Sequence, residues 1–276
     1  MLVFPNAKIN LGLYVTARRM DGYHALDTVF MPVNLCDALE INRLDPDNHA
    51  PKIQIYCSGF AIHGDIENNL VAKAYHLLDQ SFGLPPVDVR LHKAIPAGAG
   101  LGGGSSDGAF MLQALNEMFS LELEIDAIQN YARTLGSDCA FFLENRLSAA
   151  SGRGDQLSPL EMKLPDFGIV IVKPDIFLGT REAFLNIKPH KPEVSAVSAL
   201  SQPVSEWKSC LFNAFEKAAF RQYPEIESIK NRLYDLGAAY ASLSGSGSAV
   251  YGLFMTPPAF PVDFPGCFVW KSFPEQ

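Results

Sequence analysis

The sequence lacks the features of membrane-spanning, secreted and disulfide-stabilised proteins. Its longest uncharged apolar runs are strand-length pieces such as "FGIVIV" at 167–172, far short of the roughly 20 residues that a membrane-spanning helix needs. The first residues, "MLVFPNAKINLGL", show no basic region followed by an apolar core and a cleavage site, so no signal peptide is expected. The five cysteines are odd in number and widely spaced, and no CxxC pair suggests a disulfide framework or a zinc site, so we expect reduced thiols in a cytoplasmic protein.

Basic residues are also scarce. With 22 lysines and arginines against 30 aspartates and glutamates, the net charge is −8, which argues against a nucleic-acid partner. An anionic substrate would therefore need local groups that oppose the overall charge. Backbone amides in a glycine-rich loop can supply them without charged side chains.

The 276 residues, 48% of them hydrophobic, suffice for one large domain or two modest ones. The pattern is mostly β up to about residue 95, and the later strands and helices do not alternate strictly, so we expect an α+β protein of two halves, 1–155 and 156–276. The expected strands are 8–19, 26–33, 37–43, 52–58, 87–95, 169–174, 247–255 and 267–273. The expected helices are one from Asn69 to a stop at Gly83, one from Ser105 or Ser106 to about 119, 125–135, 179–187, and two between 205 and 236.

The segment "IPAGAGLGGGSSDGA" at 95–109 holds six glycines between an expected strand and an expected helix. Gly98, Gly100 and Gly103 satisfy GxGxxG, but a second helix follows where a dinucleotide-binding fold needs a parallel strand. A Walker loop is excluded because Gly104 stands where its lysine belongs, and no lysine occurs between Lys93 and Lys163. A flexible surface loop is the alternative. The composition favours a loop whose backbone N–H groups hold a polyphosphate, with the two serine hydroxyls near a phosphate or its magnesium.

Other polar residues each have two interpretations. Asn6, Lys8 and Asn10 alternate along an apolar strand and share one face, which is either solvated or functional. Asp138, in "GSDCAFFLE", is either a helix N-cap or a functional carboxylate beside an apolar run. His24, in "DGYHALDT", is either structural or presented by a turn. No pair of histidines or carboxylates has metal-ligand spacing, so we expect no protein-only metal site.

Five segments in this order resemble the GHMP kinases: "PNAKINLGLYV", "DGYHALDTVF", "IPAGAGLGGGSSDGA", "GSDCAFFL" and the second small-residue loop in "SLSGSGSAVYGLF". The resemblance implies a two-domain α+β fold, with an N-terminal domain like ribosomal protein S5 domain 2 and a ferredoxin-like C-terminal domain. It implies a kinase that uses ATP with Mg²⁺. Its small-molecule substrate would be 4-diphosphocytidyl-2-C-methyl-D-erythritol, phosphorylated at the 2-hydroxyl.

The resemblance also implies roles for residues. Lys8 and Asp138 would be the catalytic pair, and Asn69 and Lys93 would lie near the adenine. The acceptor would contact Asn10, Tyr23 (stacked on cytosine), His24 (at its polar edge), Thr180 and Phe184. The phosphate loop would comprise Pro96, Ala97, Gly98, Ala99, Gly100, Leu101, Gly102, Gly103, Gly104, Ser105 and Ser106.

Three positions depart from the usual pattern of the family, at Ala140, Asp175 and Ala214. Two other functions stay open at this point. One is a GHMP kinase for another small alcohol, of the homoserine or mevalonate type. The other is a non-catalytic nucleotide-binding protein on the same fold.

Overall fold

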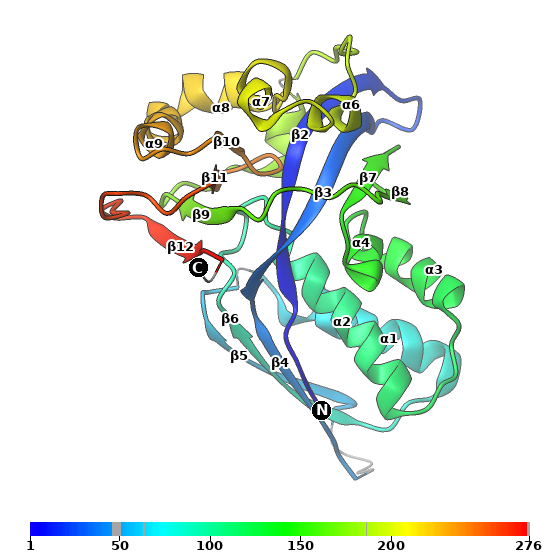
Figure 1. The fold of residues 1–276 in the computed structure, drawn as a ribbon. Coiled ribbons are helices and arrows are strands. Elements are labelled where there is room, and N and C mark those ends of the chain that lie inside the picture. Colours follow the sequence, from blue (N-terminus) through cyan, green and yellow to red (C-terminus); the bar gives the residue numbers. More distant parts are fainter. Residues whose placement is uncertain (46–50, 63, 186, 275–276) are drawn as a thin grey trace. The chain divides into compact units, whose positions relative to one another are not determined.

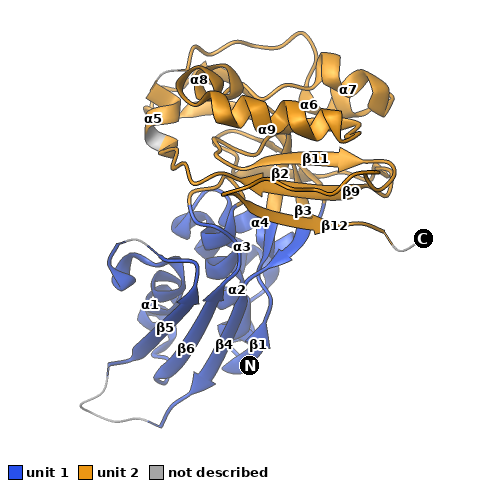
Figure 2. Ribbon diagram, turned by 90° about the vertical axis from the view of Figure 1, so that its left-hand side faces the viewer, with its two compact units in different colours: residues 1–7, 33–97, 102–146 blue, residues 8–32, 98–101, 147–276 orange. Residues whose placement is uncertain are grey.

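The computed structural model describes residues 1–45, 51–62, 64–185 and 187–274. The chain forms two compact units, coloured separately in Figure 2. Unit 1 consists of 1–7, 33–97 and 102–146, and unit 2 of 8–32, 98–101 and 147–276. The chain thus passes between the units several times. The predicted domain boundary near residue 155 stays a prediction, because a division into compact units does not test where one sequence domain ends and the next begins.

Unit 1 contains a four-stranded sheet in the order β1-β4-β6-β5 and a group of helices. Its elements are β1 (Leu2–Val3), β4 (Ala38–Arg43), β5 (Ile53–Gly59), η1 (Ile66–Asn68), α1 (Leu70–Phe82), β6 (Val87–Lys93), α2 (Gly103–Met118), α3 (Ile125–Leu135) and α4 (Cys139–Glu144).

Alternation along the strands of unit 1 creates its core. Strands β4 and β6 are antiparallel and pair Leu39 with Leu91 on the buried face and Glu40 with Arg90 on the other. Helices α1 and α2 lie side by side along the buried face (Figure 1). Helix α1 begins at Asn69, whose side chain accepts from the Val71 N–H, as expected of an N-cap.

Unit 2 contains a second sheet, in the order β10-β11-β9-β12, and most of a third, in the order β2-β3-β7-β8. Strands β2 (Asn6–Arg18) and β3 (His24–Cys36) contribute residues to both units. The other elements are β7 (Ser148–Ser151), β8 (Gln156–Pro159), β9 (Gly168–Lys173), α5 (Thr180–Leu185), α6 (Ala196–Leu200), α7 (Val204–Cys210), α8 (Glu216–Gln222), α9 (Pro224–Asp235), β10 (Tyr240–Leu243), β11 (Val250–Phe254) and β12 (Phe268–Ser272).

Helices α8 and α9 lie over one face of the sheet β10-β11-β9-β12 (Figure 2). Leu233 of α9 packs in one apolar cluster with Val170 and Val172 of β9 and with Val250 and Phe254 of β11. The run "IVIV" is buried along almost its whole length, which is typical of a central strand.

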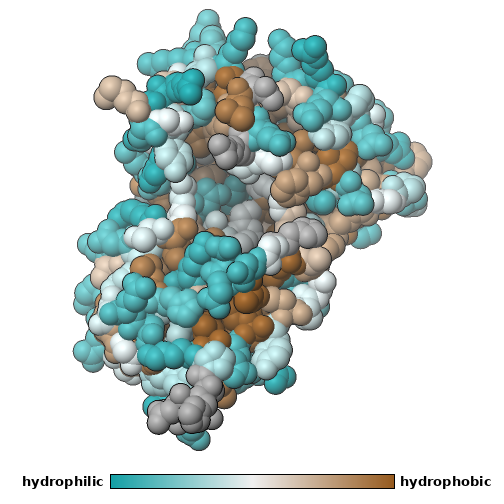
Figure 3. Space-filling view, turned by 180° about the vertical axis from the view of Figure 1, so that it is seen from behind, coloured by the Kyte–Doolittle hydropathy of each residue, from teal (hydrophilic) through white to brown (hydrophobic). Residues whose placement is uncertain are grey.

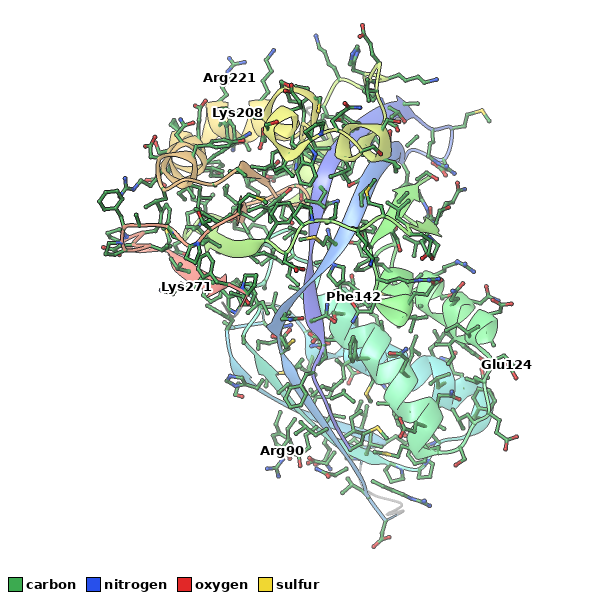
Figure 4. The ribbon with its side chains drawn as sticks, in the orientation of Figure 1. Arg90, Glu124, Phe142, Lys208, Arg221 and Lys271 are labelled. Carbon is green, nitrogen blue, oxygen red and sulfur yellow. The ribbon has the colours of Figure 1, made fainter. Side chains whose placement is uncertain are left out.

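Many charged side chains lie on the surfaces of the two units. In unit 1, Arg90 and Glu124 are exposed whereas Phe142 is buried, and in unit 2 Lys208 and Arg221 are exposed (Figure 4). On the face seen in Figure 3, hydrophobic residues form separate patches between hydrophilic ones. Within the described ranges, no helix combines the length and apolarity that crossing a membrane requires.

The mixed α+β class is confirmed, but several elements differ from the sequence prediction. Strands β7, β8 and β10 and helices α4 and α6 are missed because each has only four to six residues, too few for a clear period. The segment 205–236 holds parts of three helices rather than two, because Pro224 starts a new helix immediately after α8.

Candidate active site

The glycine-rich segment links β6 to α2, as the sequence predicts. The prediction that Ser105 or Ser106 caps the helix is wrong. Gly102 is the N-cap, with a φ of 75° that only glycine adopts easily, and both serines lie inside the first turns. No side chain caps this end in the described structure, so the first N–H groups of α2 are left for a ligand, and a helix N-terminus favours an anion.

Two glycine loops pack directly against each other within unit 2. Ser244 donates through its hydroxyl to the Gly100 carbonyl at 2.9 Å, and the Ala249 N–H donates to the Ala99 carbonyl at 3.1 Å. A Cβ atom on Gly100 would lie 1.9 Å from the Ser244 carbonyl oxygen, and its φ is +76°. Position 100 therefore requires glycine both for its conformation and for this close approach.

Lys8 lies on β2 beside the first glycine loop, since its N–H donates to the Leu101 carbonyl at 2.9 Å. Asn6, Lys8 and Asn10 are at most 7% exposed, so their shared face is not solvated. The Lys8 ammonium donates to Asn10 Oδ1 at 2.6 Å and lies 4.8 Å from the centre of the Phe30 ring.

Asn10 is itself held in place. Its Nδ2 donates to Thr28 Oγ1 at 2.9 Å, and the Thr28 hydroxyl donates to the Gly12 carbonyl. Thr28 is fully buried. This chain of hydrogen bonds fixes the Asn10 oxygen toward Lys8, so the position of the ammonium depends on Thr28, a residue that sequence analysis left without a role.

Asp138 belongs to unit 1 and occupies the N-cap position of α4. Its side chain makes no capping hydrogen bond to this helix in the described structure, so the N-cap interpretation does not account for the carboxylate. The next residue, Cys139, is buried, and burial raises the pKa of its thiol to about 12, so that thiol is not a nucleophile at neutral pH.

Lys93, expected near the adenine, ends β6 with its ammonium buried between two carboxylates. It pairs with Asp37 and, at 2.6 Å, with Asp107. Its side chain is 5% exposed, and those of Asp37 and Asp107 are 0% and 2% exposed. Any contact of the Lys93 ammonium with a nucleotide would require it to leave these partners. Asn69, the other residue expected there, caps α1.

The residues expected at the acceptor lie in unit 2. His24 stacks on Phe184, with ring centres 5.1 Å apart and an interplanar angle of 26°. The Thr180 hydroxyl lies 3.3 Å from that of Ser246, in the second glycine loop. Tyr23 is 55% exposed, and the guanidinium of Arg153 lies 5.0 Å from its ring centre.

Arg153 is held beside Tyr23 by a carboxylate two residues away. The Arg153 Nε and one terminal nitrogen both lie 3.1 Å from Asp155 Oδ2, and its backbone N–H donates to Asp155 Oδ1. Burial raises the pKa of Asp155, but these hydrogen bonds outweigh it, and the net shift is downward. The β7–β8 turn thus presents a fixed cation to one face of Tyr23.

The residues at the start of α2 fit a nucleotide polyphosphate. Ala97, Gly98 and Gly104 are exposed, and the buried hydroxyl of Ser106 has no hydrogen-bond partner among the described residues. Such an orphan hydroxyl is costly to bury unless a ligand satisfies it. No group of three or more acidic, histidine or cysteine side chains within the described ranges could hold a metal ion by itself.

Sequence reasoning overlooked Thr28, Asp37, Phe30, Asp107 and Arg153. Thr28, Phe30 and Asp107 lie inside segments quoted for the resemblance, whereas Asp37 is the first residue of the expected strand 37–43. For Thr28, Asp37 and Asp107 the only signal was a polar residue in an otherwise buried context, and the residues that each of them contacts include one distant in sequence.

Family models for GHMP kinases match both parts of the chain. The GHMP kinase N-terminal domain matches residues 69–146 and the C-terminal domain matches residues 196–259. The chain belongs to the GHMP kinase family and has its two-domain fold.

Its relatives indicate the branch of that family. The chain is 52% identical to a 4-diphosphocytidyl-2-C-methyl-D-erythritol kinase of Bacteroides fragilis over 99% of both chains. It is 56% identical to the kinase of the same name from Bacteroides thetaiotaomicron over 92% of both. A crystal structure of 4-(cytidine 5'-diphospho)-2C-methyl-D-erythritol kinase matches with a TM-score of 0.78 and 35% identity, covering 92% of this chain and 90% of the other. The mevalonate kinase of Methanococcus jannaschii, at 14% identity and a TM-score of 0.66, shares the fold.

Proposed function

We propose that this protein is an ATP-dependent kinase that phosphorylates the 2-hydroxyl of 4-diphosphocytidyl-2-C-methyl-D-erythritol, a step of the non-mevalonate route to isoprenoid precursors. The observation that carries the proposal is the identity of 52% over 99% of a relative with this kinase name. The glycine loops, the buried Lys8 and the aromatic residues of unit 2 support it from the chemistry of the site.

Phosphoryl transfer depends mainly on alignment and charge neutralisation. In the proposed mechanism Asp138 accepts the proton of the acceptor hydroxyl as the new O–P bond forms, while the bond from the γ-phosphorus of ATP to the oxygen that bridges it to the β-phosphate breaks and ADP leaves. The Lys8 ammonium, fixed by Asn10, stabilises negative charge that develops during transfer. Both roles follow from the family resemblance, and the local geometry of each residue is compatible with them.

The first turn of α2 and the backbone N–H groups of the loop from Pro96 to Ser106 would hold the phosphates of ATP. The orphan hydroxyl of Ser106 would gain a partner there. Mg²⁺ would arrive with the nucleotide and neutralise phosphate charge. Asn69 and Lys93 are proposed near the adenine.

The acceptor would bind in unit 2. Tyr23 would stack its ring on the cytosine, and His24 would contact the polar edge of the base. Asn10, Thr180 and Phe184 would line the remainder of this pocket. The free thiols lead us to propose a cytoplasmic location.

The test is ADP release in the presence of ATP, Mg²⁺ and a panel of alcohols that includes the cytidyl substrate, homoserine and mevalonate. We expect turnover with the cytidyl substrate and at least 100-fold lower kcat/KM with the others, since only the first can use the aromatic residues for base stacking. Turnover with homoserine or mevalonate alone would identify a different small-alcohol kinase. Nucleotide binding without any transfer would identify a non-catalytic relative.

A further inference from the structure

The two ends of the phosphate loop meet the same buried charges. At the first end, the N–H groups of Ala94 and Ile95 donate to Asp37 Oδ1 at 2.6 and 2.8 Å. Asp37 lies between β3 and β4, and its other carboxylate oxygen accepts from Lys93. The loop therefore leaves β6 with its first two N–H groups already fixed.

At the second end, Asp107 is the fifth residue of α2, and its Oδ2 accepts from the same Lys93 ammonium at 2.6 Å. A Cβ atom on Gly103 would lie 2.9 Å from Ile95 Cγ2 and 3.3 Å from Lys93 Nζ. The residues on either side of the loop are thus packed together around one lysine.

Stability alone does not explain three charged groups in this place. Taking charges out of water is expensive, and well-packed apolar residues of similar volume often stabilise a protein as well or better. A lysine hydrogen-bonded to two carboxylates nevertheless fixes the distances and directions between the three groups, which apolar packing does not. The Lys93 ammonium also has little capacity left to attract a phosphate, since two carboxylates already surround it.

We infer that Asp37, Lys93 and Asp107 form a buried clamp that holds both ends of the phosphate loop, Pro96 to Ser106, and thereby positions its N–H groups for the phosphates of ATP. The three are positioning residues, and this role rests on the proposed function of the loop. A loop already held in its binding geometry loses less entropy when a ligand binds. A substitution that loosens the clamp therefore weakens the binding of the nucleotide more than the binding of the acceptor.

The decisive variant is Asp107→Ala. It detaches the start of α2 but leaves Lys93 paired with Asp37, so no charge is buried alone. We expect the KM for ATP and the dissociation constant for ADP, measured by calorimetry, to rise about tenfold. The KM for the acceptor should change less than twofold. Asp107→Asn keeps an oxygen acceptor for Lys93 and should restore most of the ATP affinity.

Asp79→Ala is the matched control. Asp79 is also a helical aspartate of unit 1 that accepts from a lysine at 2.6 Å, namely Lys52, but it lies on α1 and has no contact with the loop in the described structure. It should leave both KM values unchanged. Equal increases in the KM for ATP in Asp107→Ala and Asp79→Ala, or parallel increases for ATP and acceptor in Asp107→Ala, would show general destabilisation and overturn the clamp.

Amide hydrogen exchange provides a readout that needs neither turnover nor nucleotide. In Asp107→Ala, exchange of the hydrogen-bonded N–H groups of Ala94, Ile95 and Ser106 should accelerate at least tenfold relative to wild type and to Asp79→Ala. Unchanged exchange overturns the clamp even if the kinase activity is established. Faster exchange together with an absence of transfer to every alcohol supports the clamp and refutes the proposed function. Should Asp107→Ala fail to fold, Asp37→Asn replaces it. Its amide keeps an acceptor for Ala94 and Ile95 but turns an N–H group toward Lys93, so the first end loses its link to the lysine, and the same changes in ATP affinity are expected.

Discussion

At the scale of single residues, the candidate site consists of polar groups whose positions are fixed by other buried polar groups. Lys8 depends on Asn10, and Asn10 on Thr28. Lys93 is fixed by Asp37 and Asp107. The residues that hold these groups in position matter, because a functional group must be placed within a fraction of an ångström to be effective. Substitutions of the partners should therefore affect function as well as stability.

Two substitutions test the proposed chemistry directly. Asp138→Asn removes the proposed base and Lys8→Ala removes the proposed cation, so each should lower kcat by at least about 100-fold. Binding of ATP, measured by calorimetry, should stay within about threefold of wild type, because the phosphates are held elsewhere. A wild-type kcat in Asp138→Asn would remove the assignment of the base.

The titration of Asp107 predicts a pH-dependent stability. Burial, with the charge of Asp37, raises the pKa of Asp107 from 3.8 to about 7, although Lys93 opposes the shift. The exposed Cys57 thiol is also within electrostatic range of Asp107. Between pH 3.8 and about pH 7, the ordinary and the raised pKa of Asp107, the folded protein binds more protons than the unfolded chain. Its free energy of unfolding therefore falls as pH rises. The stabilisation that protonated Asp107 contributes is fully present below about pH 4 and is lost as pH rises through about 7.

Asp107→Asn removes this titration. Relative to wild type, its free energy of unfolding should increase between pH 5 and pH 8, by at most about 1.4 kcal/mol per pH unit. Urea unfolding at several pH values measures the difference. Parallel curves for the two proteins would mean that Asp107 keeps an ordinary pKa.

At the scale of elements, turns and loops carry the candidate site while strands and helices hold them. The two glycine loops lie at the ends of β6 and β10, and the turns β2–β3 and β7–β8 bring Tyr23 and Arg153 together. Binding residues are often found on loops that a rigid scaffold positions.

Two glycines of the first loop should respond differently to substitution. Gly100→Ala places a methyl group against the Ser244 carbonyl at a positive φ, and should destabilise the fold by at least about 2 kcal/mol. Gly104→Ala meets nothing within 4 Å and lies in a helix, so it should stabilise by up to about 1 kcal/mol. If phosphates approach this backbone closely, Gly104→Ala should nevertheless raise the KM for ATP several-fold. An unchanged KM would favour the interpretation as a simple surface loop.

Arg153 offers a test of the acceptor site. A cation over an exposed aromatic ring contributes about 0.5–1 kcal/mol, so Arg153→Met should raise the KM for the cytidyl substrate about threefold and leave that for ATP unchanged. Arg146→Met is the control, because Arg146 also pairs with a carboxylate two residues away, Glu144, but lies in unit 1. The prediction fails if the two variants behave alike.

At the scale of the whole molecule, the two compact units do not follow chain order. Residues 8–32 and 98–101 belong with the C-terminal part, so Lys8 and Asp138 lie in different units although both precede residue 150. Neither half of the chain, taken in sequence order, therefore corresponds to one compact unit.

Binding of ATP should stabilise the folded protein measurably. At a free concentration 100-fold above the dissociation constant, a ligand that binds only the folded state contributes about 2.7 kcal/mol. For a chain of this size that corresponds to a Tm increase of roughly 5–10 °C. Differential scanning calorimetry with ATP and Mg²⁺ measures it. Lys8→Ala should retain the increase, and its absence in wild type would contradict the nucleotide site.

The sequence by itself determined the α+β class, most of the longer helices and strands, and the strand, glycine loop and helix at residues 87–118. These depend on local signals, namely period, caps and glycine content, and the order of the motifs was sufficient to indicate the kinase family. Only the tertiary structure decided that Asn6, Lys8 and Asn10 are buried, that Gly102 rather than a serine caps α2, and that Asp37, Lys93 and Asp107 meet. Those facts depend on partners far apart in the chain. A charged residue can be buried only where another residue neutralises it, and the local sequence does not show which distant residue will do so.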